Sequence, residues 1–70
     1  MMPLALANIG EEGIIKKVGG SPEMRAHLGD LGFVPGGTVY VVSKMGGNLI
    51  VRVKQSRVGI SEEMARKIMI

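Results

Sequence analysis

The sequence of 70 residues contains no cysteine, and its only aromatic side chains are Phe33 and Tyr40. The absence of cysteine excludes disulfides, thiol chemistry and cysteine-ligated zinc or iron–sulfur sites. A single histidine and a single aspartate leave few groups for catalysis. No nucleophile elbow, Walker A motif or dinucleotide-binding glycine motif is present. We therefore expect a protein that is not an enzyme and requires no cofactor.

Long hydrophobic runs are also missing from the chain. The apolar opening segment Met1–Ile9 is too short to span a bilayer and lacks the basic start of a signal peptide. Hydrophobic residues make up 46% of the sequence, which is enough for one small core in a chain of this length. We expect a single domain over residues 1–70, located in the cytoplasm and not inserted into a membrane.

Glycine and proline divide the first half of the chain into short elements. The run Ile14–Val18 is typical of a strand. Ser21 followed by Pro22 predicts the start of a helix, and Gly32 is placed to end it. The apolar residues of this helix recur at helical spacing and form one buried stripe, Met24, Leu28 and Leu31.

The middle of the chain predicts a β-hairpin. The segments Thr38–Lys44 and Asn48–Lys54 flank Met45-Gly46-Gly47. A loop of these three residues pairs apolar with apolar side chains, whereas a two-residue Gly-Gly turn would place the valines opposite basic residues. We therefore expect the three-residue loop, which pairs Val39 with Val53, Tyr40 with Arg52, and Val41 with Val51.

The last segment predicts a strand at Arg57–Ile60, a helix capped by Ser61, and a short edge strand at Met69–Ile70. Two i, i+4 ion pairs are expected on this helix, Glu62 with Arg66 and Glu63 with Lys67. Short strands, polar turns and two short helices indicate a mainly β fold of the small SH3-like barrel type.

One candidate metal site lies on the first predicted helix. Glu23, His27 and Asp30 share one helical stripe, and their nitrogen and oxygen donors suit Fe(II), Mn(II) or Zn(II). The alternative is that these residues form the solvated side of an amphipathic helix. Two or three donors on one helix rarely complete a metal site without a further ligand. Only weak binding of a divalent transition metal is therefore expected. A metal sensor acting through His27 would lose its metal response on His27→Ala.

A nucleic-acid-binding module is the alternative function. It would use Lys16, Arg52, Lys54 and Tyr40, with the aromatic ring stacking on a base. Single-strand platforms usually carry several aromatic residues, and only Tyr40 is available here. A solvated basic face is therefore favoured over nucleic-acid binding. The other cations considered for this face are Lys17, Lys44 and Arg57.

Apolar residues at the hairpin tip predict a protein contact. In the expected register Val42 and Ile50 pair on the outer face, Met45 lies in the loop, and Leu49 is close by. The alternative is that the two helices cover this end and make it part of the core. The sequence leaves both possibilities open.

The run from Leu28 to Gly36, LGDLGFVPG, resembles the FeoA family of small ferrous-iron-uptake proteins. Pro3-Leu4 and Gly13-Ile14 before the helix, Asn48–Val51 in the hairpin and Val58-Gly59-Ile60 near the end match the family in the expected order. The resemblance covers essentially the whole chain. A related barrel also occurs in metal-dependent repressors of the DtxR type.

The resemblance implies an SH3-like barrel that acts in the cytoplasm beside FeoB, a membrane transporter with a GTP-binding domain. It also implies transition-metal binding, for which this sequence offers only His27 and carboxylates. We expect an accessory protein of ferrous iron uptake that docks on the cytoplasmic part of the transporter. The residues predicted for this contact are Val42, Met45, Leu49 and Ile50, with Tyr40 and Arg52 beside them.

Overall fold

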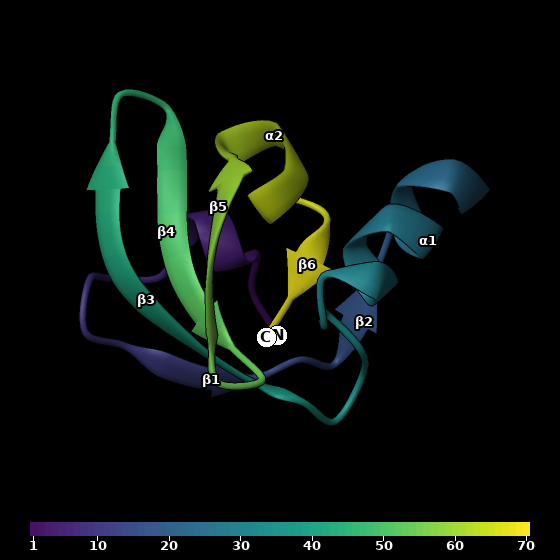
Figure 1. Ribbon diagram of the computed structural model, residues 1–70, viewed down its shortest axis with the longest axis horizontal. Helices are drawn as coiled ribbons and strands as arrows, with labels where there is room; N and C mark the ends of the chain where they lie inside the picture. The colour runs from purple at the N-terminus through teal and green to yellow at the C-terminus, as the bar shows by residue number, and fades with distance from the viewer.

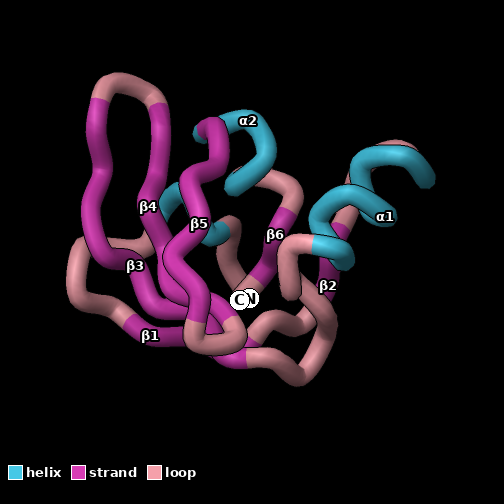
Figure 2. Tube along the Cα trace, in the orientation of Figure 1, coloured by secondary structure: helices cyan, strands magenta, loops and turns pink.

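The computed structural model describes residues 1–70 as a mainly β fold with two short α-helices, arranged around one core (Figure 1). Four antiparallel strands form one sheet in the order β1-β3-β4-β5, and β2 pairs with β6 in a second sheet (Figure 2). No helix is long and apolar enough to cross a membrane. The elements are η1 (Leu4–Leu6), β1 (Glu12–Ile14), β2 (Lys17–Val18), α1 (Pro22–Asp30), β3 (Thr38–Met45), β4 (Asn48–Val53), β5 (Ser56–Ser61), α2 (Glu62–Ala65) and β6 (Ile68–Met69).

The ends of α1 follow its sequence signals. The Ser21 hydroxyl oxygen accepts a hydrogen bond from the backbone N–H of Met24 at 3.1 Å, and Pro22 is the first helical residue. Gly32, with φ +107°, then turns the chain out of the helix. Leu28 is fully buried, while Met24 and Leu31 pack against the core from its margin. The predicted cap, end and apolar stripe are confirmed.

The predicted strand Ile14–Val18 is wrong, because the chain changes sheets in the middle of it. β1 ends at Ile14 and β2 begins at Lys17. Between them, the N–H of Ile15 donates to the carbonyl of Gly37 at 2.8 Å, and the N–H of Lys16 donates to the carbonyl of Met69 at 2.7 Å. The backbone therefore exchanges one partner strand for another within two residues, while the Ile15 side chain enters the core.

The base of the β3–β4 hairpin has the predicted register. Val39 pairs with Val53, Tyr40 with Arg52, and Val41 with Val51. The predicted three-residue loop is wrong, because a β-bulge follows Val41 and shifts the register toward the tip. The turn itself is Gly46-Gly47, with φ values of +49° and +83°. An extra residue in β3 thus allows both an apolar register and a two-residue glycine turn.

The C-terminal elements are close to their predicted positions. The Ser61 hydroxyl oxygen accepts a hydrogen bond from the N–H of Met64 at 3.1 Å and caps α2. Of the two expected ion pairs only Glu62–Arg66 forms, at 3.0 Å. The edge strand is Ile68–Met69, one residue earlier than predicted.

The core lies between the inner face of the four-stranded sheet and the remaining elements. Phe33 is its largest side chain, and α1, α2, η1 and β6 contribute the residues that face the sheet. The two chain ends meet beside it, since the N–H of Met2 donates to the carbonyl of Ile70 at 2.7 Å and the reverse bond is 2.8 Å. The core residues are Leu4, Ala7, Ile15, Leu28, Phe33, Val39, Val41, Leu49, Val51, Val53, Ile60, Ala65 and Ile68.

Candidate docking face

Tyr40 and Arg52 lie opposite each other in the middle of the hairpin, on the side that faces away from the core. The guanidinium carbon of Arg52 is 5.5 Å from the centroid of the Tyr40 ring, which is a cation–π distance. This contact restrains both side chains on the surface of the sheet. The predicted pairing of these two residues is confirmed.

Ile50 occupies the next outward position along β4. The predicted pairing of Val42 with Ile50 is wrong, because the bulge places Ser43 opposite Ile50 and leaves Val42 as the extra residue. On its other side Ile50 pairs with Gly59 of β5. A Cβ atom built at Gly59 would lie 3.4 Å from Cδ1 of Ile50, so the isoleucine packs over a strand position that has no side chain.

Met45 lies at the end of β3, where 71% of its surface is exposed. Leu49, in contrast, is only 3% exposed and pairs with the core residue Ile60. The prediction that Leu49 belongs to the surface of the tip is therefore wrong. Its side chain points to the core because it alternates in phase with Val51 and Val53. We use the name outer face for Tyr40, Val42, Met45, Ile50 and Arg52.

Neither helix covers the outer face, since α2 packs its buried Ala65 into the core and contacts η1. Figure 1 shows α1 beside β2, on the opposite side of the molecule from the β3–β4 turn. Met45 is largely exposed, and Val42 and Ile50 remain half-buried. Of the two possibilities for the tip, burial therefore applies to Leu49 and exposure to Met45, while Val42 and Ile50 lie between the two.

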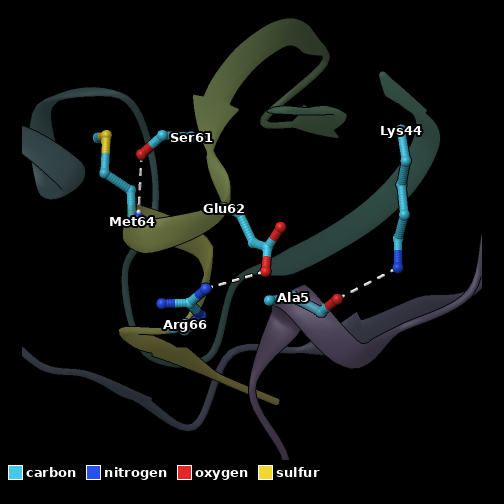
Figure 3. A network of polar contacts seen from close by, with 6 residues as sticks. All are labelled: Ala5, Lys44, Ser61, Glu62, Met64 and Arg66. Atoms are coloured by element: carbon cyan, nitrogen blue, oxygen red, sulfur yellow. Dashed lines mark hydrogen bonds and ion pairs between the residues drawn. The ribbon is translucent and has the colours of Figure 1, made fainter. Parts of the chain in front are cut away.

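Lys44 anchors the hairpin tip to the N-terminal segment. Beyond the bulge it pairs with the buried Leu49, which directs it to the inner side. Its Nζ atom donates a hydrogen bond to the carbonyl oxygen of Ala5 at 3.1 Å, as Figure 3 shows. The hairpin is thus held against η1, and its outer face is supported from behind by packed structure.

The charges on the β4–β5 side of the outer face are of one sign, whereas the acidic residue Glu12 of β1 lies opposite Tyr40 at the other border. Arg52, Lys54 and Arg57 are exposed, and Arg52 lies opposite Arg57 across β4 and β5. The sequence has no acidic residue between Asp30 and Glu62. Lys16, another member of the predicted nucleic-acid set, instead lines an open depression beside β1 together with Glu11 and Glu12. The structure therefore groups the arginines and Tyr40 but gives Lys16 acidic neighbours.

The candidate metal residues on α1 are all exposed. Glu23, His27 and Asp30 lie on the solvent side of the helix. No three histidine or acidic side chains of the chain come together in a group that could hold a metal ion. The residues present therefore do not fit a metal centre of three or more protein ligands.

Two residues of this region were not included in the predicted contact set. Gly59 leaves the strand beside Ile50 without a side chain, and Arg57 adds a cation next to Arg52. The sequence alone indicates that Arg57 could belong to a basic surface, since it lies in a long segment without acidic residues. The role of Gly59 depends on which residue it opposes, and this becomes clear only from the register of β4 and β5.

The chain is similar in sequence to known proteins along its whole length. A family model described as the FeoA domain matches residues 2–70. A protein of Methanocaldococcus jannaschii provisionally named Fe(2+) transport protein A is 34% identical over 70 residues, which are 100% of this chain and 85% of that protein.

Solved structures share the fold. The crystal structure of an iron uptake regulatory protein, FeoA, is 31% identical with a TM-score of 0.89, over 97% of this chain and 90% of that chain. FeoA of Stenotrophomonas maltophilia, complexed with zinc and described as a prokaryotic SH3 domain protein, is 24% identical with a TM-score of 0.86, over 99% and 88% of the two chains. The predicted SH3-like fold is confirmed.

Proposed function

Because this chain belongs to the FeoA family, we propose that it is an accessory protein of ferrous iron uptake, which docks on the cytoplasmic part of a FeoB-type transporter. The names of its relatives support a role in Fe(2+) transport. The structural observation that carries the docking proposal is the exposed apolar side chain of Met45 beside Ile50 on a sheet face that no helix covers.

The outer face has the residue composition of a small protein-binding surface. Met45 and Ile50 supply apolar area, and Tyr40 adds an aromatic side chain of the kind enriched at interfaces. Arg52 lies at the border, where its charge contributes specificity. Because the sheet behind these residues is packed, docking requires little reordering of the backbone, and little binding energy is lost to conformational entropy.

Metal binding by this chain has no part in the proposed docking. The only histidine is exposed on α1, away from the outer face, and no three-ligand group is present. In this proposal ferrous iron is the cargo of the transporter, and the accessory protein contributes a protein contact. Its role is non-enzymatic and regulatory.

The test is an amide NMR titration of labelled protein with the GTP-binding domain of the transporter. We expect chemical shift changes concentrated at residues 40–52. The double variant Met45→Asp, Ile50→Asp should weaken binding at least about tenfold, because charges then face the apolar centre of the contact. Leu6→Asp is the matched control, since Leu6 is 68% exposed and lies in η1, outside the outer face.

Two outcomes would contradict the proposal. The absence of any shift would exclude the GTP-binding domain as the partner, and the transporter embedded in nanodiscs would be tested next. Equal weakening by Leu6→Asp and by the double variant would exclude the outer face as the contact. Circular dichroism of each variant checks that the fold is intact.

A further inference from the structure

β5 forms one edge of the four-stranded sheet, and its outer backbone groups are free. The two-residue turn at Lys54-Gln55 makes Val53 and Ser56 a hydrogen-bonded pair. Alternation along the strand then directs the N–H and C=O groups of Arg57 and Gly59 away from β4. Outside the β4–β5 ladder, residues 56–60 make no backbone hydrogen bond.

β1, at the opposite edge of the sheet, is less suited to pairing with a partner strand. β1 has three residues, whereas β5 has six. Immediately after β1 the chain leaves the sheet, and the adjoining surface carries Glu11 and Glu12. Natural proteins commonly keep exposed edges short or irregular, which prevents unwanted strand pairing. β5 is a regular edge that lacks this protection.

The charges beside the β5 edge are left unbalanced within the chain. Arg52 and Arg57 are directly opposite each other, a like-charge pair that destabilises a sheet. Lys54 in the adjoining turn adds a third cation. The single ion pair of the molecule is Glu62–Arg66, so none of these cations is paired with an acid. An acidic occupant of the edge would neutralise them, whereas a second copy of this chain would bring two basic edges together.

We propose that β5 is a strand-addition site, at which an extended acidic segment of the docking partner pairs with Ser56–Ile60 and continues the sheet. Main-chain hydrogen bonds to Arg57 and Gly59 hold the segment in place, and its acidic side chains lie beside Arg52 and Arg57. The missing side chain at Gly59 leaves Ile50 accessible to an apolar residue of the added strand. This inference rests on the proposed function and describes how the partner would bind beside the outer face.

Hydrogen exchange of the full chain, measured by NMR with and without the transporter's GTP-binding domain, tests the geometry. The amides of Arg57 and Gly59 should exchange at least about tenfold more slowly in the complex, because they gain hydrogen bonds. The amide of Val58 already bonds within the sheet and should change little. Binding without this alternating protection would overturn strand addition and leave the proposed function intact. Failure of the domain to bind would contradict docking on that domain, and peptide binding to β5 would then decide on strand addition.

A peptide probe tests the edge independently of the transporter. An acetylated and amidated peptide matched in length to β5, with a glutamate and a valine two positions apart so that they lie beside Arg57 and Gly59, should protect the same two amides. The corresponding lysine–valine peptide, and a glutamate–valine peptide with N-methylated amides, should not bind. If the glutamate–valine peptide does not bind, or if a single-stranded oligothymidylate binds more tightly than it does, the proposal is overturned.

Charge reversal at the edge provides a matched pair of variants. Arg57→Glu should weaken binding of the glutamate–valine peptide on the order of tenfold, since like charges then meet. Arg25→Glu makes the same change in net charge at an exposed position of α1 and should leave binding unchanged. Equal weakening by the two variants would mean that only net charge matters, which would overturn the proposed site.

Discussion

The β3–β4 hairpin has two faces that are built from the same strands but meet different constraints. On the inner face Val39, Val41, Val51 and Val53 are at most 1% exposed. On the outer face the neighbouring residues are half-buried or exposed, and they include an aromatic ring, a cation and a flexible methionine. The inner face thus determines how the strands pair, and the outer face is left free for recognition.

The largest difference in stability is expected between substitutions at two adjacent residues of β4. Val51→Asp would bury an unpaired carboxylate, which should destabilise the fold by about 4 kcal/mol or more. Arg52→Asp, one residue later on the exposed face, should cost less than about 1 kcal/mol. Urea denaturation followed by circular dichroism measures both. Comparable losses in the free energy of unfolding for the two variants would show that the two faces contribute equally to stability.

A second prediction extends the inner face to β1. A Cβ atom at Gly13 would lie 2.9 Å from Cδ1 and 3.1 Å from Cβ of Ile70, so Gly13→Ala should destabilise the fold by about 1–2 kcal/mol through overpacking. Ile70→Ala removes Cδ1, the nearest of these atoms, and keeps Cβ, so the double variant should be less destabilised than the sum of the single variants. Strict additivity in thermal unfolding would contradict this explanation.

Gly59→Ala should separate stability from docking on the outer face. The new Cβ atom would meet only Cδ1 of Ile50 at 3.4 Å, an ordinary contact, so stability should rise by up to about 1 kcal/mol as chain entropy in the unfolded state falls. Affinity for the transporter's GTP-binding domain should fall, since the methyl group covers part of Ile50. Calorimetric titration measures the affinity, and unchanged binding would show that the partner does not use this position.

The smallest expected effect is the coupling between Tyr40 and Arg52. A double-mutant cycle with Tyr40→Leu and Arg52→Ala should give a coupling free energy of about 0.5 kcal/mol, because the cation–π pair is exposed to water. Equilibrium denaturation of the four proteins supplies the values. A coupling indistinguishable from zero would mean that the ring and the guanidinium contribute separately.

Local signals predicted the features that depend on a few neighbouring residues. The Ser21 cap, the Gly32 end and the register at the base of the hairpin all follow from short patterns. Ile14–Val18 failed as one strand because its backbone bonds to two distant segments, Gly37 and Met69. Such an exchange of partners is decided by tertiary packing and leaves no local pattern in the strand residues.

The candidate site was predicted only in part, because some of its residues follow from local patterns and others depend on tertiary structure. Tyr40, Ile50 and Arg52 reach the surface as alternation requires, whereas Met45 does so because the bulge shifts the phase of β3. The bulge at Val42 was missed because the glycine turn and the apolar register were treated as alternatives, and one inserted residue satisfies both. Leu49 could have been assigned to the core from its phase with Val51.

The paired ends of the chain have a consequence for engineering. Because Met2 and Ile70 exchange two backbone hydrogen bonds, a short linker would join the termini with little change in either segment. The resulting ring could be reopened at Gly46-Gly47, which would give a circular permutant of the domain. The same proximity suits insertion into a surface loop of a host protein, since both host segments would meet the domain at one point.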